Sequence, residues 1–204
     1  MIWDSGMLLS SGTAVGRERI WKGKRVWDPK HSKLSALYHK INITELELTP
    51  AMRVLYLGAG NGTTVSFVAD YVEVVYAIDP APEPMTDLIS VAEKRTNIIP
   101  LLSDARKPEE FSGIVEEVDV VYQDVAQPTQ VDIFISNCTQ FLKHGGIGIL
   151  MLKTRSIDVR QDPKEISEAA VEVISRSGYT ILDSVWLMPW HQDHIALLCC
   201  RLQS

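Results

Sequence analysis

Arg53–Thr64, with the sequence RVLYLGAGNGTT, decides the fold of this chain, because an apolar run breaks abruptly into alternating glycines. Val54–Leu57 lacks polar alternation, which is typical of a strand buried on both faces of a parallel sheet. Gly58, Gly60 and Gly62 let the backbone turn sharply and approach a ligand where a Cβ would collide. The stretch therefore predicts a strand, a ligand-binding turn and a following helix.

An acidic residue, Asp79, ends the next apolar run, VEVVYAID, where a carboxylate can accept both hydroxyls of a ribose. Thr63 and Thr64 begin the intervening helix, where they either cap it or touch the ligand. Glycines in this spacing are also typical of a flexible turn. The order of the elements, which is strand, glycine turn, helix, strand and terminal acid, favours a nucleoside-type cofactor at the edge of a parallel sheet where the strands end.

Strands and helices alternate from Arg53 onward, which implies βαβ units and a parallel sheet. We expect strands at 53–57, 74–79, 97–102, 118–123, 146–152, 180–187 and 194–201, and helices at 63–71, 84–94, 128–142 and 163–177. Only MPWHQD separates the last two strands, so they should pair antiparallel at one edge. The predicted fold is α/β, a Rossmann-like class I S-adenosylmethionine-dependent methyltransferase with a seven-stranded, mostly parallel sheet.

A smaller unit precedes this domain. Short β-prone pieces within residues 6–30 predict a hairpin ending at Asp28–Pro29, and a helix should follow over residues 32–40. We therefore expect a β-rich N-terminal extension over residues 1–50 and the methyltransferase domain over residues 51–204.

Charge is divided unevenly along the 204 residues, whose net charge is −6. Residues 17–40 contain eight Lys or Arg against two acids, interleaved with Trp21, Trp27 and Tyr38. This basic segment either meets a phosphate backbone or forms a solvated, salt-bridged face. Because the rest of the chain is acidic, we expect a partner to supply much of the affinity for nucleic acid.

Composition also bounds location and metal chemistry. No apolar run approaches the roughly 20 residues that span a bilayer, and the N-terminus lacks the basic region of a signal peptide, so we expect an intracellular, cytoplasmic protein. The three cysteines, Cys138, Cys199 and Cys200, have no CxxC spacing, which argues against a zinc site and a disulfide framework. We expect no metal.

Polar groups follow five consecutive predicted strands, at the edge where open α/β sheets bind ligands. They are Gly58–Thr64, Asp79, Asp104–Ala105, Asp124–Gln127 and Lys153. Asp104 either holds an adenine amino group or caps a helix before Pro108, and Asp124 either faces the cofactor or caps a helix before Pro128. A dehydrogenase fits less well, because its fingerprint is GxGxxG, so the pattern favours S-adenosylmethionine.

From Lys24 to the C-terminus the chain resembles fibrillarin in its short archaeal form. The segments that carry the resemblance include VWDPKHSKLSA, RVLYLGAGNGTTVSFVAD, KRTNIIP, DVAQP and KTRSIDV. The resemblance implies an S-adenosylmethionine-dependent RNA ribose 2′-O-methyltransferase, the catalytic subunit of a box C/D guide ribonucleoprotein, acting on rRNA and with tRNA as a further candidate. It implies as partners guide and target RNA, a Nop-type scaffold protein and a kink-turn-binding ribosomal-like protein.

The resemblance also implies site residues. Those of the donor pocket are Gly58, Ala59, Gly60, Gly62, Thr63, Thr64, Asp79, Pro80, Asp104, Ala105, Asp124, Val125, Ala126 and Gln127. Those of the catalytic group are Lys33, Asp124, Lys153 and the pair Asp193 and His194. Lys153 either takes the 2′-hydroxyl proton or only orients the hydroxyl, and His194 is either the proton acceptor or a structural histidine.

The chain departs from the family pattern near the donor pocket. GAGNGTT replaces the common GAASGTT, and Asp79 stands where the family has Glu, so the backbone must approach the ribose more closely. Two alternative functions remain. One is a stand-alone FtsJ-like rRNA 2′-O-methyltransferase, and the other is a non-catalytic structural subunit of an RNA–protein complex.

Overall fold

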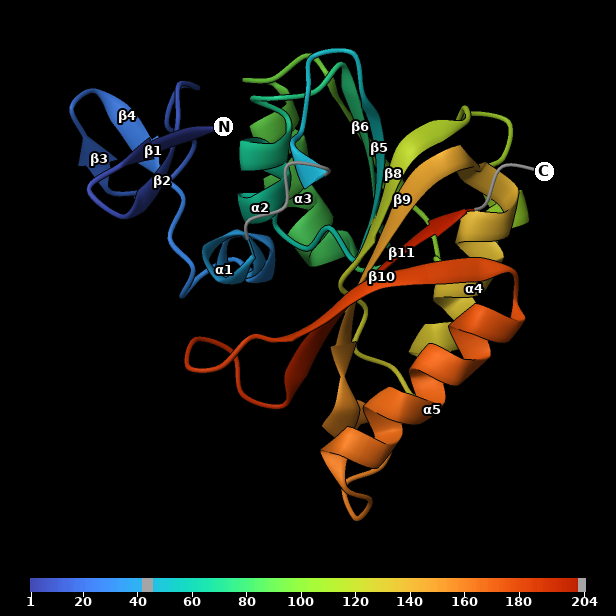
Figure 1. Cartoon of the computed structure of the whole chain (residues 1–204). Coiled ribbons are helices and arrows are strands. Elements are labelled where there is room, and N and C mark those ends of the chain that lie inside the picture. Colours follow the sequence, from blue (N-terminus) through green and yellow to red (C-terminus); the bar gives the residue numbers. More distant parts are fainter. Residues whose placement is uncertain (42–45, 202–204) are drawn as a thin grey trace.

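A seven-stranded sheet forms the centre of the molecule in the computed structural model, which describes residues 1–41 and 46–201 (Figure 1). The strand order is β10-β11-β9-β8-β5-β6-β7, and the ladders from β9 to β7 are parallel. The strands are β5 (Arg53–Leu57), β6 (Val74–Asp79), β7 (Ile98–Leu102), β8 (Val118–Gln123), β9 (Leu142–Lys153), β10 (Tyr179–Trp186) and β11 (His194–Arg201). The predicted mostly parallel sheet is confirmed.

The last two strands form the predicted antiparallel edge. β11 lies between β9 and β10 and runs antiparallel to both. At the opposite edge, Pro100 sits within β7, where a residue without an amide hydrogen costs no internal ladder bond. The antiparallel strands therefore lie at one edge of the sheet, and the parallel neighbours β5 and β8 lie near its middle.

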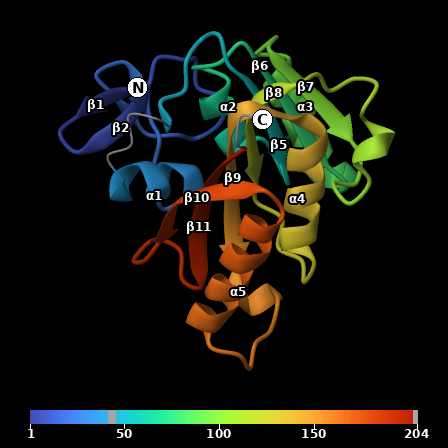
Figure 2. The same cartoon turned by 45° about the vertical axis from the view of Figure 1, so that its right-hand side comes forward.

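Helices cover both faces of the sheet (Figures 1 and 2). Residues of α1 (Lys33–Lys40), α2 (Thr63–Val68) and α3 (Pro82–Ala92) share one core with Val54 and Tyr56. Residues of α4 (Gln130–Phe141) and α5 (Pro163–Arg176) share the other core with Leu55 and Leu57. Alternate residues of β5 thus face opposite cores, which explains why Val54–Leu57 contains no charged residue.

A separate antiparallel sheet precedes the main one, in the order β1-β2-β4-β3. Its strands are β1 (Ile2–Asp4), β2 (Met7–Ser10), β3 (Ile20–Trp21) and β4 (Lys24–Val26). Both hairpins turn through two residues with positive φ, Ser5–Gly6 and Lys22–Gly23, as two-residue hairpins prefer. The prediction of one hairpin is therefore incomplete, because β1 lies before the first expected β-prone piece. The domain boundary at residue 50 stays a prediction.

Buried charges fasten the small sheet to the main domain. The side chain of Arg25 is 1% exposed and pairs with Glu18 at 2.6 Å and with Asp70, just after α2, at 2.8 Å. Arg95 pairs with the other oxygen of Asp70 at 2.9 Å. Trp27, directly after β4, stacks on Phe67 of α2 with ring centroids 5.2 Å apart. These contacts fix the segment that leads into α1.

We expect Asp70→Asn to lower the free energy of unfolding by about 3–5 kcal/mol, because it leaves two buried guanidinium groups without their shared carboxylate. Urea denaturation measures the change. Glu172→Gln, which removes the exposed partner of Arg176 on α5, is the control and should cost less than about 0.5 kcal/mol. Equal, small losses in the two variants would show that the buried pairs do not hold the N-terminal sheet.

Candidate functional site

The glycine turn after β5 is shaped by close contact with the end of β8. Gly58, Gly60 and Gly62 have φ values of +80°, +53° and +81°. A Cβ on Gly58 would lie 2.4 Å from the carbonyl oxygen of Asp124, so no side chain fits there. A Cβ on Gly60 would meet nothing within 4 Å. The turn is therefore packed against the sheet at Gly58 and open at Gly60, as a ligand-binding turn requires.

Asp79 holds the open part of this turn. Its carboxylate is 8% exposed and accepts the amide hydrogens of Gly60 at 2.7 Å and Ala81 at 2.9 Å. Each carboxylate oxygen keeps a second lone pair, so these bonds are compatible with a ribose hydroxyl as a further partner. The predicted ribose contact of Asp79 stays a prediction.

The two threonines after the turn do not cap α2. Gly62 occupies the N-cap position, without a side-chain cap. The hydroxyl of Thr63 donates to Asn61 Oδ1 at 2.9 Å, and the hydroxyl of Thr64 donates to Ser32 Oγ at 3.1 Å. The capping alternative for the threonines is therefore wrong.

Asp104 follows β7 and pairs with its neighbour Arg106. The carboxylate accepts the backbone amide of Arg106 at 2.9 Å and its guanidinium at 2.5 Å. This hydrogen bonding to Arg106 holds the pKa of the Asp104 carboxyl below its ordinary value. The N-cap of the next helical turn, Pro108–Glu110, is Lys107, so the capping alternative for Asp104 is wrong. Asp104 is an Asx-turn residue, and its adenine contact stays a prediction.

An ion pair between Lys33 and Asp124 joins two distant parts of the chain. Lys33 is the first residue of α1 and Asp124 follows β8, and their Nζ and Oδ2 atoms are 2.8 Å apart. Their side chains are 21% and 22% exposed, so the pair is partly shielded but reachable. The N-cap of α4 is Thr129, so Asp124 is not a helix cap.

Lys153 and His194 are directly opposite each other in the β9–β11 ladder. Cross-strand partners of this kind place their side chains on the same face of a sheet. The buried side chain of Gln130 fixes the end of β9, because it accepts the amide of Lys153 at 2.9 Å and donates to its carbonyl at 3.1 Å. Gln130 was not among the residues predicted for the site. A polar residue in the first turn of an otherwise apolar helix face is the signal for it.

The surroundings of His194 lower the pKa of its imidazole and so favour the neutral form. Burial lowers its pKa below the ordinary value, the charge of Lys33 lowers it further, and the charge of Asp124 acts in the opposite direction. Nδ1 is 2.8 Å from the carbonyl oxygen of Gln192. Because a carbonyl only accepts, Nδ1 carries the hydrogen and Nε2 keeps the lone pair. The charges of Lys33 and Asp124 both act on His194, so the three side chains share one neighbourhood, and the Nε2 lone pair can accept a proton.

Asp193 points elsewhere. Its carboxylate pairs with Arg155 at 3.2 Å, and its carbonyl accepts the backbone amide and the hydroxyl of Thr154, both at 3.1 Å. Of the two adjacent candidates, the geometry favours His194 over Asp193. The structure thus brings Lys33, Asp124 and His194 together, with Lys153 opposite His194, and directs Asp193 toward Arg155.

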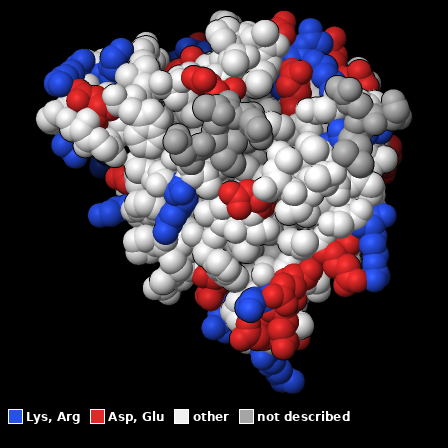
Figure 3. All heavy atoms as spheres, in the orientation of Figure 1, with Lys and Arg blue, Asp and Glu red and all other residues white. Residues whose placement is uncertain are grey.

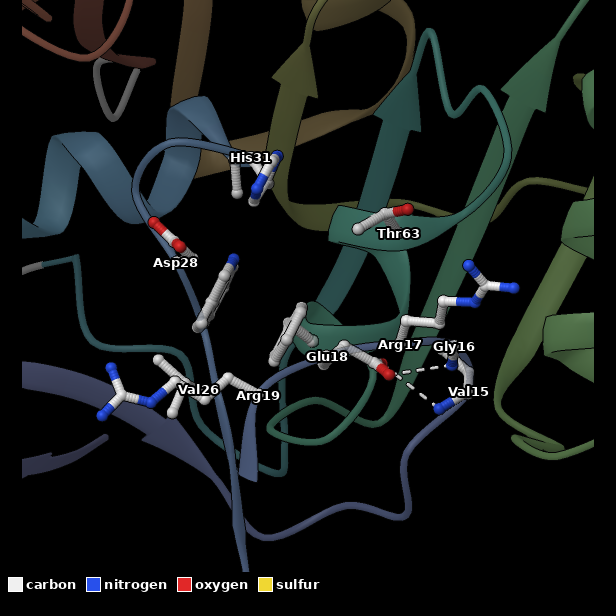
Figure 4. A pocket seen from close by; sticks show the side chains of 12 residues that line it. Val15, Gly16, Arg17, Glu18, Arg19, Val26, Asp28, His31 and Thr63 are labelled. Atoms are coloured by element: carbon white, nitrogen blue, oxygen red, sulfur yellow. Dashed lines mark hydrogen bonds between the residues drawn. The ribbon is translucent and has the colours of Figure 1, made fainter. Parts of the chain in front are cut away.

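A cavity of about 360 Å³ borders this group, between residues 15–19 and the start of α2 (Figure 4). Thr63 and His31 lie on facing sides of it, and Glu18 accepts the amides of Val15 and Gly16. Ser32, next to Lys33, also lines the cavity. The cavity therefore adjoins the start of α1, where Lys33 lies, from the side of the N-terminal extension.

Charge on the surface follows the division expected from the sequence (Figure 3). Lys and Arg side chains gather over the small sheet, and acidic side chains gather over α5. Arg25 and Lys33, however, already pair with carboxylates inside the molecule, and Lys22 pairs with Asp4 at 2.7 Å. Of these three residues, Arg25 is internal, because its side chain is 1% exposed, and it is not available for contact with RNA.

Two classes of feature are absent from residues 1–41 and 46–201. None of their helices is both long and apolar enough to cross a membrane. No three His, Cys, Asp or Glu side chains in the same part of the chain form a group that could hold a metal ion.

Comparison with known proteins gives the same fold and family. The family model described as Fibrillarin matches residues 8–203. A fibrillarin-like rRNA/tRNA 2′-O-methyltransferase of Methanoculleus marisnigri is 54% identical, over 98% of this chain and 99% of that protein. The structure of a fibrillarin/Nop5p complex is similar with a TM-score of 0.91 and 40% identity, over 96% of this chain and 94% of that one. Aeropyrum pernix fibrillarin, solved with natively bound S-adenosyl-L-methionine, gives a TM-score of 0.84 and 36% identity, over 95% and 88% of the two chains.

We expect Gly58→Ala and Gly60→Ala to separate the two sides of the turn. Both introduce a Cβ at positive φ, which costs about 1–2 kcal/mol, but only Gly58→Ala also collides with the Asp124 carbonyl. Thermal denaturation should show the larger loss for Gly58→Ala, by several degrees in Tm. Equal losses would mean that β5 and β8 do not depend on this close approach.

Proposed function

Because this chain belongs to the fibrillarin family, we propose that it is an S-adenosylmethionine-dependent RNA ribose 2′-O-methyltransferase that acts on rRNA and tRNA. The observation that carries the proposal is the Lys33–Asp124 ion pair beside the glycine turn. A cofactor pocket and a charged group for a hydroxyl substrate thus share one edge of the sheet. Methyl transfer to an alcohol needs both.

The residues at the strand ends have the chemistry that the donor requires. Gly60 leaves the turn open, Asp79 presents a buried carboxylate, and Asp104, Ala105 and the segment 124–127 follow the neighbouring strands. When bound, S-adenosylmethionine would supply a sulfonium methyl group for in-line transfer to an oxygen nucleophile, with the thioether S-adenosylhomocysteine as the leaving group. The chain's own contribution is to hold the hydroxyl close to that methyl group and to exclude competing water.

The proton of the 2′-hydroxyl needs an acceptor, and we assign that role to His194. A lysine near its usual pKa would have to be biased by about 4–5 kcal/mol to be neutral at pH 7. The lowered pKa of His194 leaves its Nε2 lone pair free without such a bias. Lys153, opposite His194 on β9, then orients the hydroxyl, while Lys33 and Asp124 fix the position of the group around it.

The partners we propose are a box C/D guide RNA with its target RNA, a Nop-type scaffold and a kink-turn-binding protein. The similar structure of a fibrillarin/Nop5p complex supports the scaffold. The net charge of −6 supports the need for partners, since an acidic chain binds a polyanion weakly alone. A stand-alone FtsJ-like enzyme would not need them. A purely structural subunit would not need a neutral histidine beside the Lys33–Asp124 pair.

A reconstituted assay with guide, target, both partner proteins and labelled donor tests the activity and its pH dependence. Because His194 must be neutral to accept a proton, the single-turnover rate should rise with pH through a midpoint below 6.5 and then level off. His194→Ala should lower the plateau rate by about 10²–10⁴-fold and abolish the rise of the rate with pH. Lys153→Ala should also lower the rate but keep its rise with pH.

The chain alone should bind S-adenosylmethionine in calorimetry yet leave naked target RNA unmodified. Robust turnover by the chain alone would contradict the partner requirement. If His194→Ala kept the wild-type rate and its rise with pH, His194 would not be the proton acceptor. Absence of donor binding would favour the structural-subunit alternative.

A further inference from the structure

We infer that Ser32 and Thr64 form a hydroxyl latch that positions Lys33 on Asp124, and that Thr64 acts through this latch and not by contact with the donor. The inference rests on the proposed methyl transfer and deepens it. It assigns Thr64 a role different from the donor contact that the family resemblance implies.

The latch joins the starts of two helices. Thr64, in the first turn of α2, donates its hydroxyl hydrogen to Ser32 Oγ at 3.1 Å. Ser32 is the N-cap of α1, and the same oxygen accepts the backbone amide of Ser35 at 3.3 Å. Since Lys33 is the next residue, the bond from Thr64 fixes the point from which the Lys33 side chain extends.

The sheet supports Thr64 from the other side. The phenol of Tyr56 on β5 lies close enough to Thr64 for the threonine side chain to act on its pKa, downward, against the larger effect of burial, which raises it. The ring of Tyr56 packs on that of Tyr122 with centroids 4.5 Å apart, and Tyr122 lies two residues before Asp124 on the chain. A continuous path of contacts therefore runs from the strands that carry Asp124 to the cap of the helix that carries Lys33.

The hydroxyl of Thr64 already has a hydrogen-bond acceptor within the chain. A threonine hydroxyl has one hydrogen to donate, and Thr64 donates it to Ser32, which is 3% exposed. Thr63 also donates its hydrogen, to Asn61 Oδ1, but its side chain is exposed and lines the cavity (Figure 4). Because Thr64 is less exposed and its hydrogen bond joins it to α1, Thr63 is the threonine that an external ligand reaches more easily.

Precise placement of Lys33 matters for the rate. A lysine side chain loses much rotamer entropy when it is fixed, so the Lys33–Asp124 pair depends on how well its backbone is held. The segment before α1 has other tethers, namely His191 Nε2 to the Pro29 carbonyl at 2.8 Å and Ser35 Oγ to the Trp27 carbonyl at 2.5 Å. Loss of the latch should therefore loosen Lys33 without unfolding α1.

The test compares Thr64→Val, which keeps the shape and removes the hydroxyl, with Thr64→Ser, which keeps the hydroxyl. In the reconstituted complex, Thr64→Val should lower the single-turnover rate at saturating donor by about 10- to 100-fold. The Kd for S-adenosylmethionine, measured on the same protein by calorimetry, should stay within twofold. Thr64→Ser should restore the rate.

Ser32→Ala breaks the latch from the other end, and its effect on the rate should not add to that of Thr64→Val in the double variant. Thr86→Val is the control, because it removes a threonine hydroxyl that donates to the Pro82 carbonyl within α3, and it should leave rate and Kd unchanged. Denaturation midpoints identify any variant that has lost its fold.

Weaker donor binding by Thr64→Val with an unchanged rate at saturation would overturn the inference, and so would wild-type values for both quantities. Additive effects of the two substitutions would also contradict it. Failure of the proposed function is distinguishable, because the wild-type complex itself would then transfer no methyl group.

Discussion

The close approach between Gly58 and the carbonyl of Asp124 constrains everything else in the site. The amide of Asp124 bonds to the carbonyl of Leu57, and the amides of Gly58 and Ala59 both bond to the carbonyl of Ile78. Three parallel strand ends are thereby drawn into one turn, with no room for a side chain at Gly58. The same turn brings Gly60 within reach of Asp79 and fixes Asp124 at the edge of the crevice.

The N-terminal extension completes the site from outside the sheet. Arg25 and Trp27 dock the small sheet on α2, and the chain then reaches the crevice as α1 begins. Buried ion pairs are weak evidence for stability, but they specify one arrangement, because either partner left alone is costly. That specificity suits a segment whose task is to deliver a single lysine to Asp124.

Much of the fold could be predicted from the sequence, because buried apolar runs are its strongest local signal. The strands 53–57, 74–79, 118–123 and 194–201 have the predicted ends. β9 is longer than the expected strand at 146–152, since it begins at Leu142 and includes Gly145 and Gly146. The short strand β1 was missed, because three residues cannot display an alternating pattern.

The site was harder to predict from the sequence than the fold, because its contacts join residues that are far apart in the chain. Lys33 and Asp124 are 91 positions apart, and only the family resemblance pointed to Lys33. The capping alternatives for Asp104, Asp124 and the threonines, all wrong, assumed hydrogen bonds to the start of the next helix. The observed partners of Asp124 and Thr64 come instead from the N-terminal extension. The choice between Asp193 and His194 depended on strand register, which residue types alone do not specify.

The central claim is that the crevice at the ends of β5, β6 and β8 holds the methyl donor beside Lys33, Asp124, Lys153 and His194. A crystal structure of the chain with S-adenosylmethionine tests it most directly. The account predicts the adenosine against Asp79 and Asp104, and the sulfonium methyl group directed toward the Lys33–Asp124 pair. A donor bound instead between residues 15–19 and α2, with the strand-end crevice closed by side chains, would contradict it.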